Sequence, residues 1–495
     1  MRVPARNALS GALLVRRASA RLDVPTAVVP CRVRYHAIGF LALNVVRRCC
    51  DLVAINVSPS LCGEVCPDAK YCQICASEDI KSAIVDMKEL REYRSIDLDA
   101  NPCIFPHCGH MMTVSSMDIH LGMSDYYESL DDGTIIAIKG PCKPFSSTTV
   151  KGCPKCRGGL REISRYGRLV RQALLDESTR RFICWSHSQC SLLQRRLIDE
   201  QQRLEHAKNS RKPLQLSDEE SKHEMGVVQI DHMLAIHKWI KNSRYQRIIA
   251  LYLDIFLCMD RVRDEEKPYK RVFDLVEQAR RIEGVTGQSE LSSSQVQTGG
   301  ELLAQVILFR CYLLVLSDFV ELRTNASKQC TTMHFGLEKP LEDCELLINL
   351  ARTSGYAIQE AEGHLFFVRI VALVKLLATS EESVDLEAVG LSEVIVTKAK
   401  GHYAKAEAIV YGHSSAVYLR QELDSVGKML DSGIFYRGMS VQAQRGVYEE
   451  TTKKFTGIGG WHTCPRGHPF VLTDNKWLVK NSRCPECDVC LEILP

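Results

Sequence analysis

Apolar residues recur every three to four positions over most of the chain between residues 217 and 455. The runs with this spacing are 225–241, 245–262, 272–282, 302–322, 341–378 and 386–428. Such a period is typical of α-helices that bury one face in a core. Breaks fall at 284–300, which is rich in Ser, Gly and Gln, and at Lys339-Pro340. The runs share no fixed repeat length, so we predict a mainly α fold, an irregular helical bundle or array.

The stretch before these runs is also helical in pattern, but it is basic. Residues 160–212 predict one or two helices, with a stripe made of Arg161, Arg165, Arg168 and Arg171. With Tyr166 beside it, the stripe could follow a phosphate backbone and stack on a base. Glu162 and Asp176 dilute the charge, and we therefore favour an ordinary solvated helix face.

Metal-ligand side chains take over from the helical pattern at the end of the chain. Cys464 and His468 form a C-x3-H pair, and Cys484 and Cys487 form a C-x2-C pair. Two such pairs supply the four soft ligands of a tetrahedral Zn²⁺. A segment this short cannot bury a core of its own, so zinc would supply folding energy on the order of 10 kcal/mol. We predict a small zinc module over 456–495.

A second group of ligand pairs precedes the helices. The pairs are Cys72 with Cys75, Cys108 with His110, and Cys153 with Cys156. Their order, C-x2-C, then C-G-H, then C-P-x-C, predicts a RING-like cross-braced module over 61–160, in which the last two pairs share one zinc.

The second zinc of this module needs two more ligands beside Cys72 and Cys75. His107, Asp118 and Cys142 are all competent, as are Cys103 and His120. We predict Cys103 and His120 for this site, which with the C-terminal module makes three zinc ions per chain.

Composition narrows the class of protein. The chain has 495 residues, a net charge of +3 and 22 cysteines. This length suggests about three domains, and the charge is too small to require a nucleic-acid partner. Cysteines in short-spaced pairs favour metal sites in a reducing compartment over disulfides. Arg310 interrupts the most apolar run, 306–316, which we expect to be a buried helix, and no membrane span is predicted.

The motifs of nucleotide-binding and hydrolytic enzymes are missing from the sequence. Gly427-Lys428 lacks both the glycine-rich approach and the following Ser or Thr of a phosphate-binding loop, so no nucleotide is expected. Neither G-x-S-x-G nor H-E-x-x-H occurs, and we expect no catalytic residues. Residues 1–60 are rich in Arg and poor in acids; we interpret them as a leader outside the fold, with a mitochondrial presequence as the alternative.

The C-terminal segment resembles the RZ-type zinc finger, on the runs G-W-H-T-C-P-R-G-H-P-F and S-R-C-P-E-C. Its ligand positions correspond to the four residues named above, and its framework positions are Trp461, Gly467, Phe470 and Ser482. The region from residue 61 resembles the part that follows the helicase in fungal helicase-like proteins with X-box-factor-type zinc fingers. The shared runs are C-G-E-V-C-P, P-C-I-F-P-H-C-G-H and C-P-K-C-R-G-G-L-R.

The resemblance implies structural zinc modules, in a cytoplasmic protein, that bind RNA or protein in innate immunity or RNA surveillance. The alternative function is that of an E3 ubiquitin ligase, with the RING-like module holding a ubiquitin-conjugating enzyme. Asn475 stands where the family usually carries one more Cys, so thiol transfer by the finger is not expected. We predict a non-enzymatic zinc protein with 161–455 as its helical region.

Overall fold

The computed structural model describes residues 70–130, 134–139, 152–161, 163–209, 223–240, 243–265, 278, 281–282, 295–324, 333–378, 386–453, 455, 460–472 and 483–490. All of them belong to the compact unit Leu43–Pro495. The predicted leader, Cys142, Asn475, Ser482 and most of the run 272–282 lie outside the described residues.

The part before residue 167 is built from short elements. They are α1 (Glu78–Lys81), β1 (Cys103–Ile104), β2 (Met112–Thr113), α2 (Val114–Leu121), β3 (Tyr127–Ser129) and β4 (Ile135–Ile138). The strands form two antiparallel hairpins, β1 with β2 and β3 with β4. Two small apolar clusters hold them, one around Tyr93 and Met111 and the other around Met112, Met117 and Leu121.

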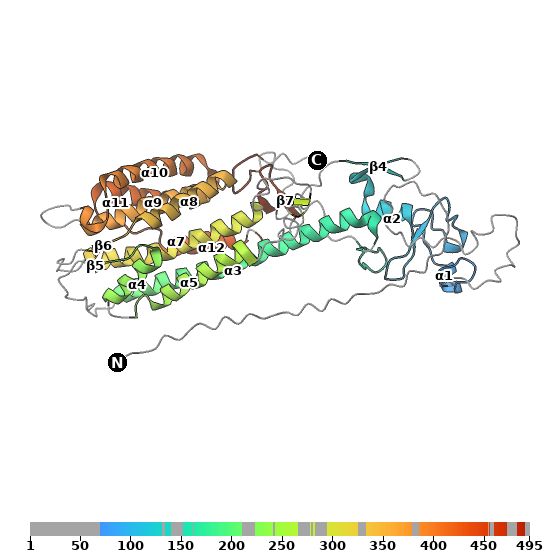
Figure 1. The fold of residues 1–495 in the computed structure, drawn as a ribbon, viewed down its shortest axis with the longest axis horizontal. Helices are drawn as coiled ribbons and strands as arrows, with labels where there is room; N and C mark the ends of the chain where they lie inside the picture. Colours follow the sequence, from blue (N-terminus) through green and yellow to red (C-terminus); the bar gives the residue numbers. More distant parts are fainter. Residues whose placement is uncertain are drawn as a thin grey trace. The chain divides into compact units, whose positions relative to one another are not determined.

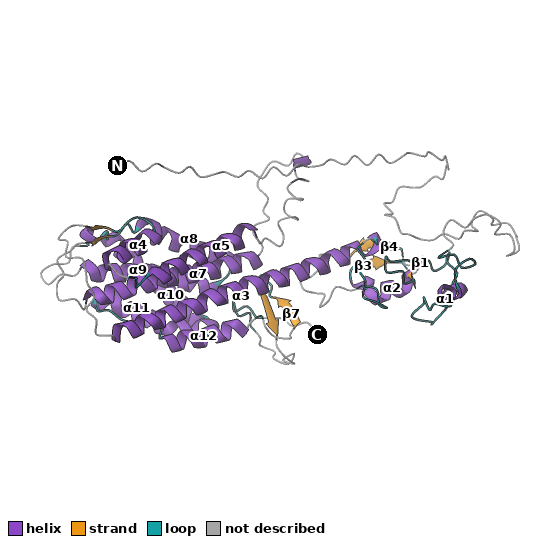
Figure 2. Cartoon of the chain, turned by 90° about the horizontal axis from the view of Figure 1, so that it is seen from below, coloured by secondary structure: helices purple, strands orange, loops and turns teal. Residues whose placement is uncertain are grey.

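The rest of the described chain is an array of helices (Figures 1 and 2), so the predicted mainly α fold is confirmed. Its helices are α3 (Gly167–Asn209), α4 (Gln229–Ile240), α5 (Gln246–Asp260), α7 (Gln295–Thr324), α8 (Glu338–Ser354), α9 (Ala357–Ala378), α10 (Glu393–Gly412), α11 (Arg420–Ser432) and α12 (Val441–Lys453). Two-residue strands β5 (His223–Glu224) and β6 (Met333–His334) pair in parallel.

Helix α9 is the centre of the array. It contacts α7, α8, α10 and α11, and α7 in turn contacts α3 and α5. Most of its residues are buried, including the continuous stretch from Ala361 to Val374. A helix that is buried on every side lies in the core of an array and has other helices around it.

The structure corrects several predicted helix boundaries. The run 341–378 is two helices, since Gly355 adopts the left-handed conformation (φ +76°) that ends α8; a side chain with a Cβ is strained there. The run 386–428 is divided between α10 and α11 by the 3-10 turn Ser414–Leu419. The predicted break at 284–300 extends too far, because α7 already includes Gly299 and Gly300. Pro340 lies in the first turn of α8, where a missing N–H costs nothing.

Residues Val296–Thr324 are long and apolar enough to cross a bilayer, but 72% of their most apolar window is buried inside the array. Contact with α3, α5 and α9 accounts for this apolarity. The predicted buried helix at 306–316 is thus found in the middle of α7.

Two Arg-Tyr pairs at the beginnings of helices each hold an aspartate from elsewhere in the chain. Arg244 donates to both carboxylate oxygens of Asp318 at 2.7 and 2.9 Å, and the Tyr245 hydroxyl donates to the same group at 2.7 Å. Arg165 and Tyr166 hold Asp118 in the same way, at 3.0, 2.5 and 2.9 Å. Three hydrogen bonds, two of them from a guanidinium, thus fix each carboxylate in place.

The second of these pairs bears on the basic stripe. Arg165 is engaged by Asp118, and Tyr166 is fully buried. Neither side chain is therefore available to a nucleic acid. The solvated face predicted for the stripe is not found here either, because Arg165 is largely buried and both residues lie in the 3-10 turn Ser164–Tyr166 that precedes α3.

The isolated histidines and cysteines of the array have structural places. His232 is fully buried, His364 and His402 face each other with their Nδ1 atoms 2.7 Å apart, and the sulfurs of Cys258, Cys311 and Cys344 lie in the core. Cys330 lies outside the described residues.

Close packing between α8 and α9 depends on Gly363. A Cβ at this position would lie 2.8 Å from Ile348 Cγ1. We expect Gly363→Ala to lower the free energy of unfolding by about 1–3 kcal/mol, because the helices must separate. Gly401→Ala on α10 is the control: it meets nothing within 4 Å and should raise stability by about 0.5–1 kcal/mol. Urea denaturation of both variants measures the difference; equal effects would contradict the packing argument.

Stability should fall on acidification because of His232. Burial lowers its pKa from 6.5 to about 4, and its ring lies 2.8 Å from Tyr312 Oη and 3.1 Å from the Gly226 carbonyl oxygen. Below pH 6.5 the unfolded chain binds a proton that the folded chain does not, which costs about 2 kcal/mol at pH 5. His232→Gln should reduce the stability difference between pH 7 and pH 5 by that amount in urea denaturation. The exposed His206, changed to Gln, should leave the difference as it is.

Candidate metal centres

Two groups of three cysteines and one histidine are brought together by the fold. Cys108, His110, Cys153 and Cys156 form the first group, and Cys464, His468, Cys484 and Cys487 form the second; in each group the ligand atoms all lie within 4.8 Å of one another. These are the eight residues that the sequence predicts for two of its three sites.

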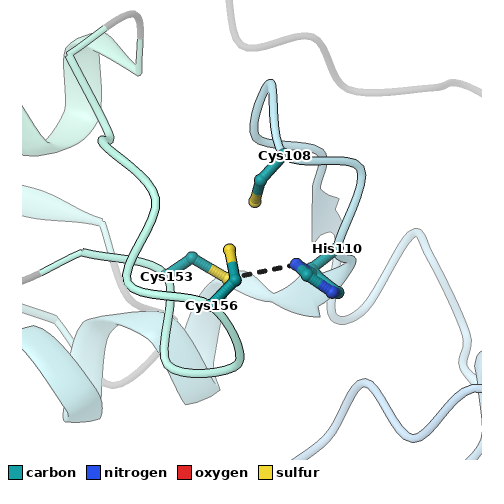
Figure 3. Close-up of side chains that lie close together, drawn as sticks. All are labelled: Cys108, His110, Cys153 and Cys156. Carbon is teal, nitrogen blue, oxygen red and sulfur yellow. Dashed lines mark hydrogen bonds between the residues drawn. The ribbon is translucent and has the colours of Figure 1, made fainter.

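The first group joins a hairpin loop to a tight turn. Cys108 and His110 lie in the loop between β1 and β2, and Cys153 and Cys156 lie in the segment that precedes α3. Figure 3 shows the three cysteines and His110 gathered around one space. The sulfur of Cys153 lies 3.7 Å from His110 Nδ1.

The second group repeats this construction. Strands β7 (Gly460–Thr463) and β8 (Pro469–Leu472) pair with Trp461 opposite Val471, and the loop between them carries Cys464 and His468. The turn that follows supplies Cys484 and Cys487. The sulfur of Cys464 lies 3.8 Å from that of Cys487 and 3.5 Å from His468 Nδ1, and Cys484 lies 3.8 Å from the same nitrogen.

The two C-P-x-C turns have the same backbone. In the first, the Arg157 N–H donates to the Cys153 carbonyl and the Cys153 N–H donates to Gly158. In the second, the Asp488 N–H donates to Cys484 and the Cys484 N–H donates to Val489. Arg157 and Asp488 both have positive φ, 59° and 55°. This uncommon conformation in non-glycine residues turns the chain sharply enough for two sulfurs to face one point.

The distances fit a tetrahedral metal ion. Zinc with Zn–S of about 2.3 Å and Zn–N of about 2.0 Å places two sulfurs ~3.8 Å apart and a sulfur ~3.6 Å from a nitrogen. The observed values are 3.8 Å and 3.5–3.8 Å. Three sulfurs and one imidazole also match the ligand preference of zinc. The two groups are therefore Cys3His-type sites suited to a metal ion such as zinc.

The protonation states of the first group favour a cation. Burial raises the pKa of Cys108 to about 11, whereas the Gly158 N–H lowers the pKa of Cys156. The raised value means that Cys108 gives up its proton only when a positive charge takes its place. Metal binding therefore releases protons and neutralises thiolates that would otherwise repel one another.

His468 connects the second site to the helices. Its Nδ1 faces the sulfurs, while its Nε2–H donates to the Ser354 carbonyl at the end of α8, 2.9 Å away. The ring of Tyr356 lies 4.4 Å from the His468 ring, centroid to centroid. Burial lowers the pKa of His468, so the imidazole is neutral and able to bind a metal at neutral pH. A second hydrogen bond of this kind orients a metal-binding histidine.

The third predicted site does not form a ligand group within the part of the chain that the structure describes. Among the described residues, neither Cys72, Cys75, Cys103 nor His120 belongs to a group of three or more ligands. Cys103 is buried beside Val85, Tyr93 and Met111, which raises its pKa to about 12. His120 is exposed, with Nε2 3.2 Å from the Gly152 carbonyl oxygen.

Cys72 and Cys75 share one backbone hydrogen bond with the two C-P-x-C turns. The Ala76 N–H donates to the Cys72 carbonyl at 2.9 Å, and the Ile74 N–H lies 3.4 Å from the Cys72 sulfur. The other ligands considered for this site have different places: Asp118 binds Arg165, His107 is exposed, and Cys142 lies outside the described residues.

Sequence reasoning did not identify the Ser354 and Tyr356 contacts of His468, because nothing in the pattern of α8 or α9 marks them. Comparison with protein-family models gives no match. Comparisons with curated proteins and with solved structures give no match either. The assignment of two zinc-type modules therefore rests on the ligands and their geometry.

Zinc content tests both sites. The full-length protein should hold zinc at the two described groups, and Cys464→Ser should remove one zinc ion because three ligands bind far more weakly than four. Elemental analysis after purification without added metal measures this content. Cys184→Ser, at an exposed cysteine outside both groups, should change nothing. An unchanged zinc content in Cys464→Ser would contradict the second site.

Proposed function

We propose that this protein is a non-enzymatic zinc protein whose two structural zinc modules, carried by a helical array, bind a protein partner. The observation that supports this most is the closed ligand set at both sites. Catalytic zinc keeps an open position for water or substrate, whereas structural zinc has four protein ligands. Three sulfurs and one nitrogen at tetrahedral spacing fill all four positions.

An exposed apolar surface in the module before α3 supports a protein partner. Ile74, Ile84, Met87 and Leu90 are all exposed, Leu90 by 66%. The loop that carries the last three is held in shape by Asp86, whose carboxylate accepts from the Lys88 and Glu89 N–H groups and from the Ser116 hydroxyl. Apolar side chains on a rigid loop cost little entropy on binding, as in protein interfaces. We call these four residues the apolar loop surface.

An RNA partner has less support. Arg165 of the basic stripe and the adjacent Tyr166 are both hydrogen-bonded to Asp118. The net charge of the chain is only +3. The resemblance of 460–487 to RZ-type fingers supports a cytoplasmic setting and a role in innate immunity or RNA surveillance. In that setting the protein would act as an adaptor.

A ubiquitin ligase is the second candidate. Ile74, between Cys72 and Cys75, is 48% exposed, and Lys155 of the Cys153–Cys156 turn donates to the Ile84 carbonyl at 3.0 Å. The bond from Lys155 joins the loop that carries Ile84 to the turn that carries two metal ligands. Exposed apolar side chains beside such a turn are what recruitment of a conjugating enzyme would require. In this candidate the zinc remains structural.

The apolar loop surface is tested by Leu90→Asp. A charge at the centre of a protein interface should reduce recovery of crosslinked protein partners from cells about tenfold or more. Val394→Asp, at an exposed position of α10, should leave recovery unchanged. Partners that crosslink equally to both variants, or ultraviolet crosslinking to RNA that Leu90→Asp abolishes, would contradict a protein-binding role for this surface.

The two candidates are separated by autoubiquitination with a panel of conjugating enzymes. For the adaptor we expect no ubiquitin chains with any enzyme. Chains that form with the wild type and with Cys184→Ala, but not with Cys153→Ala, would establish the ligase instead.

A further inference from the structure

A cavity of about 600 Å³ lies among α3, α7, α9, the turn Ser414–Leu419, α12 and the C-terminal zinc module. This volume is within the range of sites for small organic molecules. It is far larger than the voids that ordinary side-chain packing leaves. Neither zinc site occupies it.

Apolar side chains form most of its wall. Ile183 comes from α3, Leu303 and Ile307 from α7, Ile358 from α9, and Val417 from the 3-10 turn. Four separate segments of the chain therefore converge on one apolar space, as they do around bound organic ligands.

The zinc module closes one side. Pro469 and Pro485, each next to a ligand of the second site, line the cavity. This side is fixed to the helices by the bond from His468 to Ser354 and by a bond of 3.0 Å from the Ser414 hydroxyl to Asp488. Two hydrogen bonds therefore hold this wall of the cavity against the helical array.

Arg310 is the one Arg or Lys among the described residues that line the cavity. It lies in α7, and its Nη2 donates to Glu362 of α9 at 2.5 Å. An arginine has five N–H donors, and in the described part of the chain Glu362 is the one acceptor that Arg310 engages. Its side chain keeps 17% of its surface accessible. The guanidinium thus has donors to spare at the wall of an apolar space.

We propose that this cavity binds a small organic molecule with an apolar body and an anionic head group that accepts hydrogen bonds from Arg310. The body lies against Leu303, Ile307 and Val417, and the head group lies at the α7–α9 side. Burial of the apolar body supplies the affinity, and the guanidinium sets the orientation.

Two fluorescent probes test the proposal on the full-length, zinc-loaded protein. The probe 8-anilinonaphthalene-1-sulfonate has an apolar body and an anionic head, and N-phenyl-1-naphthylamine has the same body without the sulfonate. We expect saturable binding of the sulfonate probe to the wild type. Leu303→Trp should weaken this binding at least tenfold because the indole fills the cavity. Leu253→Trp, at an exposed position of α5, should bind like the wild type.

A second cavity variant covers a failure of Leu303→Trp to fold. Val417 is 49% exposed in a short turn, so Val417→Trp should fold and still reduce affinity. Wild-type affinity in a folded cavity variant, or no saturable binding to the wild type, would overturn the proposal.

The head group is tested by changing both members of the ion pair. Arg310→Met combined with Glu362→Met leaves no unpaired buried charge. It should weaken binding of the sulfonate probe about tenfold, as expected for a charged hydrogen bond, and leave the neutral probe unchanged. An equal loss for both probes, or no loss for either, would overturn the role of Arg310.

Discussion

Both ends of the described chain depend on the same electrostatic requirement. Three thiols and an imidazole are held with their ligand atoms within 4.8 Å, at Cys108 to Cys156 and again at Cys464 to Cys487. Thiolates at this distance repel one another, and thiols at this distance leave their sulfurs without strong partners. A divalent cation satisfies all four ligands at once. The small apolar clusters around each group can then complete the fold, although neither is large enough to drive it.

The sequence was sufficient where the interacting residues form short, regular patterns. The ligand pairs at Cys464 and Cys484 can be recognised from their spacing. The helical period between 225 and 428 predicts the array. The ends of the helices inside that array were harder to predict from the sequence. The division between α8 and α9 depends on one left-handed residue, Gly355, and an isolated glycine in an apolar run has several possible meanings.

Contacts between residues far apart in the chain could not be predicted from the sequence. Cys103 and His120 were predicted as ligands from among several competent residues; the first lies in an apolar cluster, and the second is exposed beside the Gly152 carbonyl. Asp118, considered as a ligand, instead accepts three bonds from Arg165 and Tyr166. Such hydrogen bonds depend on which segments the fold brings together, and the local spacing of residues does not indicate this. The same is true of the cavity, whose walls come from six parts of the chain.

His468 uses both of its ring nitrogens, one toward the sulfurs and one toward the end of α8. Cysteine would bind the metal equally well at this position. A thiolate, however, carries no hydrogen and could not donate a hydrogen bond to the Ser354 carbonyl. The two ligand types, interchangeable in zinc chemistry, are thus not interchangeable here. What selects the imidazole is a helix terminus far away in the sequence.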